Sequence, residues 1–267
     1  MQIILAATAL SYVIATFFRI REKVVNAPMK NHSRLSLIFA IILNLALMYV
    51  STDSARTSSE FELASLLIVG CLGLGLASIS IEILMHENYF SIFSLPVGTV
   101  LLLMSLLVTG QISGPHFSQP WFIAHLIASI TGECFFLIAA ISSATYLFVV
   151  RKLKNKNRLK ALYLFPPLAR LDTLTYRTIV FGAISFLIGV LIGLYGNLKY
   201  FSNFTPAFKH IFSLVLLVYY GGIMIFRDPL KLAGPRLANA ALFGFALAAA
   251  LLLIPDNQMH WLEEAGK

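Results

Sequence analysis

Eight long apolar runs constrain the fold of this chain more than any other feature of its sequence. A helix needs roughly 20 apolar residues to cross the hydrocarbon core of a bilayer, and continuous runs of this kind favour helices over strands. The sequence therefore predicts an all-α polytopic integral membrane bundle, a single transmembrane domain over residues 1–267, with a short first helix and a fifth that tilts or projects. The predicted spans are Ile3–Phe18, Leu35–Ser51, Leu63–Leu84, Phe90–Thr109, Trp121–Val150, Thr178–Gly196, Phe208–Phe226 and Leu237–Ile254.

The composition agrees with a membrane protein and argues against a nucleic-acid-binding one. Hydrophobic residues make up 58% of the chain and charged residues 12%, with a mean hydropathy of +0.83. A soluble domain carries about twice that charged fraction. The net charge of +8 could suggest nucleic acid, but the basic residues cluster between the apolar runs, as in membrane topology, instead of forming one binding face.

The basic residues also predict the orientation of the helices. If the N-terminus lies outside, 16 of the 20 Lys and Arg residues fall on the inner side. The first run is preceded by no basic residue, so we expect a retained helix and not a cleavable signal. These patterns predict a multi-pass protein of a bacterial inner membrane, with both termini on the outer, periplasmic side.

The longest inner loop is predicted over residues 151–177. Its first part is strongly basic, so we expect it to lie against anionic lipid headgroups. Its second part is interrupted by Pro166 and Pro167, and a short helix is predicted to follow, with Asp172 as its N-cap. Membrane lipids are therefore expected partners of this loop.

Three histidines are predicted near the outer face of the membrane: His125 in the fifth run, His210 near the start of the seventh, and His260 just after the eighth. Two neutral imidazoles that face each other can serve as axial ligands of a low-spin haem iron. A single histidine at a membrane interface can equally be a polar residue without a ligand. Glu133, about 12 Å deeper than His125 on the same helix, could serve a proton path or be hydrogen-bonded inside the bundle.

Other chemistry is poorly represented in the sequence. Cys71 and Cys134 lie inside apolar runs without the spacing of a zinc site or of covalent haem attachment, so we expect small core residues. No nucleophile, zinc-protease or phosphate-loop motif is present. We therefore expect a protein that is not an enzyme.

The region from the fifth run onward resembles a known family. The stretches WFIAHLIASITGECFFLIAAISSATYLFVVRKLKNK and FPPLARLDTLTYRTIVFGAISFLIGVLIGLYG are similar to the CcsA- and CcmC-like cytochrome c assembly proteins, including their small HemX-type and YpjD-type relatives. In that family a histidine-initiated helix is followed by a basic loop, a Pro-Leu-x-x-Leu-Asp-x-x-x-Tyr-Arg stretch and a Gly-rich helix. The matching residues are His125, Gly132, Pro167, Leu168, Leu171, Asp172, Tyr176, Arg177, Gly182, Gly189 and Gly193.

The resemblance implies a membrane protein that binds haem, of the b type, through axial histidines near the outer face. His125 matches the first ligand, and His260 matches the second in position only. His210 stands where the larger members have a tryptophan, and KYFSNFTPAFKH replaces their tryptophan-rich segment. Phe226 and Arg227 stand where the family has an inner histidine. The implied partners are haem and other membrane proteins of cytochrome c biogenesis or of the respiratory chain.

Two alternatives remain at this point. The chain could be an accessory or scaffold subunit of a membrane redox complex, or a regulator of haem biosynthesis, with no bound haem and with the 151–177 loop as its docking surface. It could also be a small-molecule transporter that uses Glu133.

Overall fold

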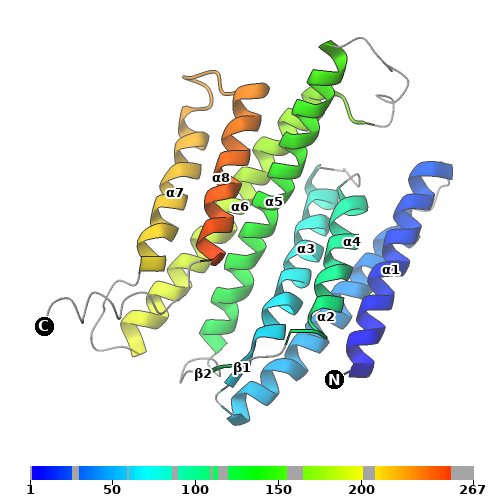
Figure 1. Ribbon diagram of the computed structural model, residues 1–267, viewed down its shortest axis with the longest axis vertical. Helices are drawn as coiled ribbons and strands as arrows, with labels where there is room; N and C mark the ends of the chain where they lie inside the picture. The colour runs from blue at the N-terminus through cyan, green and yellow to red at the C-terminus, as the bar shows by residue number, and fades with distance from the viewer. Residues whose placement is uncertain are drawn as a thin grey trace, which may run out of the picture. The chain divides into compact units, whose positions relative to one another are not determined.

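The computed structural model describes residues 2–25, 30–58, 60–85, 90–108, 111–113, 120–154, 165–200 and 208–253. Eight helices lie within these ranges, which confirms the predicted helical membrane bundle (Figure 1). The helices are α1 (Gln2–Val25), α2 (Lys30–Ser58), α3 (Leu63–Met85), α4 (Ser91–Met104), α5 (Pro120–Lys154), α6 (Leu168–Tyr200), α7 (Phe208–Phe226) and α8 (Pro235–Leu253).

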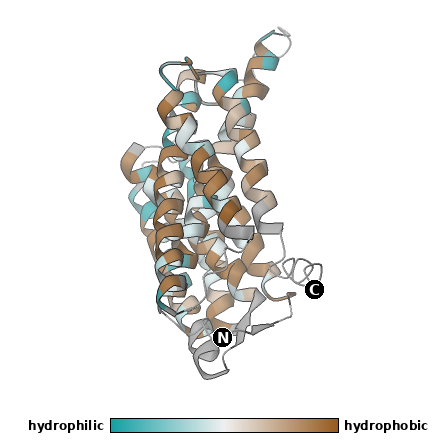
Figure 2. Ribbon diagram, turned by 90° about the vertical axis from the view of Figure 1, so that its left-hand side faces the viewer, coloured by the Kyte–Doolittle hydropathy of each residue, from teal (hydrophilic) through white to brown (hydrophobic). Residues whose placement is uncertain are grey.

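Five of these helices are long and apolar enough to cross a membrane by length and composition: α1, α2, α3, α5 and α6. The described parts of α4, α7 and α8 form shorter apolar helices, so their crossing stays a prediction. Figure 2 shows hydrophobic residues along most of the length of the helices. Many large apolar side chains are exposed on them, which suits contact with lipid rather than water.

Two sequence predictions about helix ends were wrong. The first helix is not short: it continues from the apolar run through Arg19 to Val25 and has 24 residues. The short separate helix expected after Pro167 is instead the beginning of α6, which runs without interruption from Leu168. Asp172 is therefore inside α6 and not its N-cap. In both cases the helix extends beyond its apolar run through polar residues that have partners elsewhere in the unit, Arg19 on α3 and Asp172 in the turn between α7 and α8.

The described residues fall into two compact units, Met1–Cys134 and Phe135–Lys267, and the boundary lies within α5. In the first unit α1 packs on α2 and α4, while α3 packs on α2 and α4, so the four helices form a closed ring (Figure 1). The ring surrounds a core of buried apolar side chains that includes Tyr12, Leu37, Leu47 and Leu72.

A short β-ladder closes one end of this ring and was not predicted. Strand β1 (Glu60–Glu62) pairs in antiparallel fashion with β2 (Gln111–Ser113), and Phe61 lies opposite Ile112. The two strands belong to connections that the sequence placed on the same, outer side. Their pairing confirms that these connections share one end of the unit.

The second unit combines α6, α7 and α8, which pack on one another, with the second half of α5. Phe136 of α5 stacks on Tyr220 of α7 with ring centroids 3.8 Å apart. Small buried residues let the helices approach closely: Ala139, Ala183, Ala241 and Ala248. Close helix contacts through small residues are a general means of association in membranes.

Gly75 provides a close helix contact in the first unit. A Cβ built there would lie 2.6 Å from the hydroxyl oxygen of Tyr12, which accepts a hydrogen bond from Asn44 and donates one to the Cys71 carbonyl. We expect Gly75→Ala to lower the free energy of unfolding by about 1–3 kcal/mol, because the added methyl displaces the buried phenol. Thermal or SDS-induced unfolding of the purified protein measures this loss.

The matched control for this prediction is Gly70→Ala. A Cβ at Gly70 meets only Leu101 Cδ1 at 3.5 Å, an ordinary contact, so little stability should be lost. In a Tyr12→Phe background the cost of Gly75→Ala should shrink, because the obstructing oxygen is gone. An equal cost in both backgrounds would show that the hydroxyl is not the obstacle.

Candidate functional site

His125 lies in the second turn of α5. The helix begins at Pro120, a position where the missing N–H of proline costs nothing. The imidazole is half-buried, and its Nδ1 lies 3.5 Å from the Ser129 hydroxyl oxygen, one turn further along the helix. The Phe122 ring lies beside it, with centroids 6.4 Å apart. The imidazole therefore has an aromatic neighbour on one side and a polar one on the other.

The position of His125 is fixed by the apolar side chains around it in α5. These residues pack against the core of the α1–α4 ring: Ile123, Leu126, Ile127 and Ile130. Deeper in the same helix, a Cβ at Gly73 of α3 would lie 3.0 Å from Cys134 Sγ, so α3 and α5 are in close contact there. The first half of α5 is thus a fifth helix of the first unit.

The structure describes less of the other two predicted haem ligands, His210 and His260. His210 is the third residue of α7, in the second unit, and its side chain is outside the described residues. His260 also lies outside the described residues. The pairing of His125 with either of them stays a prediction.

The chemistry of His125 fits one axial ligand of a haem. An imidazole near the end of an apolar helix can coordinate iron in its neutral form, and the adjoining Phe122 suits an apolar macrocycle. Within the described ranges no group of three or more His, Cys, Asp or Glu side chains gathers as a metal site. A haem needs no such group, because its porphyrin supplies four of the ligands.

Glu133 and the cysteines lie deeper in the helices. The Glu133 side chain is half-buried, eight residues after His125. Cys71 and Cys134 are buried free thiols, which confirms that they are core residues. A role for Glu133 in proton movement or transport stays a prediction.

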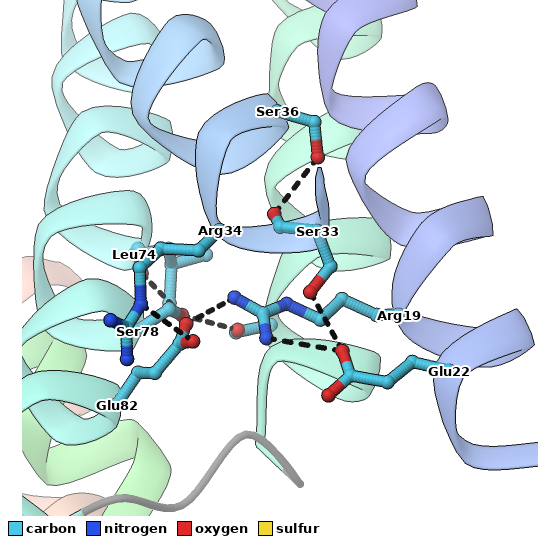
Figure 3. A network of polar contacts seen from close by, with 9 residues as sticks. Arg19, Glu22, Ser33, Arg34, Ser36, Leu74, Ser78 and Glu82 are labelled. Atoms are coloured by element: carbon cyan, nitrogen blue, oxygen red, sulfur yellow. Dashed lines mark hydrogen bonds and ion pairs between the residues drawn. The ribbon is translucent and has the colours of Figure 1, made fainter. Parts of the chain in front are cut away.

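A buried ionic cluster joins α1, α2 and α3 (Figure 3). It lies near the C-terminal end of α3, at the opposite end of that helix from strand β1. Arg19 of α1 donates a hydrogen bond to Glu82 of α3, and Arg34 of α2 donates one from Nε to the same carboxylate at 3.1 Å. Glu82 is 0% exposed and Arg19 1%. Three helices therefore meet on one carboxylate, which we call the Glu82 cluster.

The sequence predictions missed the Glu82 cluster. Arg19 was counted only among the basic residues of the inner side, and the structure buries it in the first unit. The available signal was Glu82 itself, a carboxylate in the last turns of an apolar run. Because Arg19, Arg34 and Glu82 all fall near helix ends predicted to share the inner side, their ion pairing could have been inferred.

The second unit has a smaller polar cluster around Asp172. One oxygen of this carboxylate accepts a hydrogen bond from the Gly234 N–H at 2.6 Å, and the other lies 3.6 Å from the Arg227 guanidinium. Arg227 also lies over the Tyr176 ring, 3.6 Å from its centroid. Gly234 has a positive φ of 60°, which glycine adopts without strain. Asp172 thus ties the α7–α8 turn to the first turns of α6.

Comparison with known proteins identifies the family. A family model described as Cytochrome C assembly protein matches residues 29–254. The chain belongs to the cytochrome c assembly protein family. Searches of the curated proteins and of the solved structures gave no match. The family assignment confirms the resemblance found in the sequence, while the HemX-type branch stays a prediction.

Cytochrome c assembly proteins are membrane proteins associated with haem handling in cytochrome c biogenesis. The matched range includes seven of the eight helices and all of the residues around His125 and Asp172. Helix α1 lies outside it, although α1 supplies Arg19 and Tyr12 to the interior of the first unit. This cytochrome c assembly protein therefore builds its first unit partly from a helix that the family model does not cover.

Proposed function

We propose that this protein binds b-type haem near the outer face of a bacterial inner membrane, with His125 as one axial ligand. The observation that carries the proposal is the half-buried imidazole near the start of α5, beside Phe122, in a chain of the cytochrome c assembly family. The second ligand in this proposal is His260 or His210. Both termini would lie on the outer side.

In this proposal the protein holds or passes on haem and changes no covalent bond in a substrate. Haem supplies the redox-active iron, while His125 orients it and the apolar helix faces exclude water. Its partners would be other membrane proteins of cytochrome c biogenesis or of the respiratory chain. The tryptophan-rich segment of larger family members is replaced here, so we propose haem binding without assigning the attachment step.

Absorption spectroscopy of single histidine variants tests the proposal. Full-length protein purified after haem supplementation should show a reduced α-band and a positive pyridine haemochrome assay. His125→Ala should lose both, because one axial bond is missing, and the partner histidine should reveal itself by the same loss in His210→Ala or His260→Ala. His32→Ala is the matched control, because His32 is an exposed residue near the start of α2. Absence of the band in wild type would overturn the proposal.

A second candidate function is a scaffold subunit of a membrane redox complex, or a regulator of haem biosynthesis, with no bound haem. It is favoured by the exposed basic end of α5, where Arg151, Lys152 and Lys154 form the last turn. Such a surface suits an acidic partner. Copurification of a stoichiometric partner that persists in His125→Ala and is lost in Arg151→Glu would support this function over the first.

A further inference from the structure

The Glu82 cluster brings two guanidinium groups onto one carboxylate. Figure 3 shows the guanidinium groups of Arg19 and Arg34 on opposite sides of the Glu82 carboxylate. Glu22, the other nearby carboxylate, is 3.7 Å from Arg19 and also accepts a hydrogen bond from the Ser33 hydroxyl. The four charged side chains in contact, Arg19, Arg34, Glu22 and Glu82, therefore balance in formal charge.

Some guanidinium N–H groups of the Glu82 cluster make no hydrogen bond within the described residues. Arg19 is buried, and its Nε and Nη1 have no hydrogen-bond partner among the described residues. Arg34 is about one-third exposed and donates to Glu82 through Nε. Within the described part of the chain, no hydrogen bond involves the terminal amino groups of Arg34. A planar guanidinium edge of this kind matches two oxygens of a phosphate.

The apolar surface next to Arg34 indicates that such a phosphate would belong to a lipid headgroup. The exposed face of α2 continues from Arg34 through Ile38, Ile42 and Leu45, at intervals of three or four residues. These side chains are exposed and apolar, so they suit acyl chains. The charged guanidinium at the helix end can therefore face a phospholipid headgroup, while the apolar stripe next to it faces the acyl chains.

We propose that Arg34, backed by the buried Arg19, binds the phosphate of an anionic phospholipid whose acyl chains lie along the exposed face of α2. Basic pockets between the ends of membrane helices are suited to such headgroups. Glu82 contacts Arg34 through Nε and leaves the terminal amino groups of Arg34 to the phosphate. This site is independent of the proposed haem site, because it lies at the opposite end of the first unit.

Native mass spectrometry of the delipidated full-length protein tests this proposal. Wild type should retain phosphatidylglycerol in preference to phosphatidylcholine. Arg34→Gln should weaken phosphatidylglycerol binding about fivefold, the effect of one basic residue at an anionic membrane surface, and leave phosphatidylcholine binding unchanged.

Arg151→Gln is the matched control, since it removes one exposed arginine from the end of α5. Equal weakening by Arg34→Gln and Arg151→Gln would overturn the proposal, because the attraction would then be diffuse. Displacement of phosphatidylglycerol by millimolar inorganic phosphate would also overturn it, since the site would then take the free ion. If Arg34→Gln fails to fold, Arg34→Lys replaces it in the test, because a lysine can keep the ion pair with Glu82. It should still bind more weakly than wild type, because an ammonium has no planar edge.

Discussion

Glu82→Ala is expected to lower the free energy of unfolding by about 3–5 kcal/mol, the usual cost of removing one partner from a buried ion pair. The loss is large because Arg19 is buried and would keep its charge without a carboxylate in contact. Arg34 would suffer less, because its exposed edge can be hydrated. Thermal or SDS-induced unfolding of the purified protein, followed by circular dichroism, measures the difference.

Two controls separate the buried charge from general disruption of the helices. Glu22→Ala removes the more distant of the two carboxylates that face Arg19, at 3.7 Å, and should cost less than Glu82→Ala because Arg19 keeps its hydrogen bond to Glu82. The double variant Arg19→Met, Glu82→Leu removes both charges and should recover most of the lost stability, because apolar replacement of buried pairs is often neutral. If the double variant is as unstable as Glu82→Ala alone, packing and not charge explains the effect.

The number and type of helices could be predicted from the sequence because membrane spans need long apolar runs, and those runs are visible without tertiary information. The ends of the helices could not. Helix α1 continues to Val25 and α6 begins at Leu168, and within these extensions Arg19 pairs with Glu82 of α3 and Asp172 with Gly234 in the α7–α8 turn. Those partners are distant in the chain, so a local pattern does not reveal them.

The candidate site was predictable only in part, for a related reason. His125 stands out in the sequence because an imidazole in an apolar run is unusual, and the structure places it half-buried beside Phe122. The histidine proposed to pair with it depends on which helix ends approach it, and run lengths and charge counts do not determine that. The Glu82 cluster was missed because basic residues were assigned to loops by counting, without asking which of them an acidic residue on another helix could bury.

The second unit is expected to depend on Asp172 as the first depends on Glu82. Asp172→Ala should lower the free energy of unfolding by about 1.5–3 kcal/mol, the range for a hydrogen bond to a charged group. The variant leaves the Gly234 N–H without its acceptor and Arg227 without its carboxylate. Because these contacts hold the α7–α8 turn, limited proteolysis should also cut this turn faster in the variant.

Asp172→Asn separates the two contacts that the carboxylate makes. The amide oxygen can still accept from Gly234 N–H, while the charge that faces Arg227 is lost. Arg227 keeps its position over Tyr176, and the pair with Asp172 is partly exposed, so most of the stability should remain. We therefore expect Asp172→Asn to cost less than half as much as Asp172→Ala. Equal losses would contradict this and would make the Arg227 ion pair, rather than the Gly234 hydrogen bond, the contact that holds the turn.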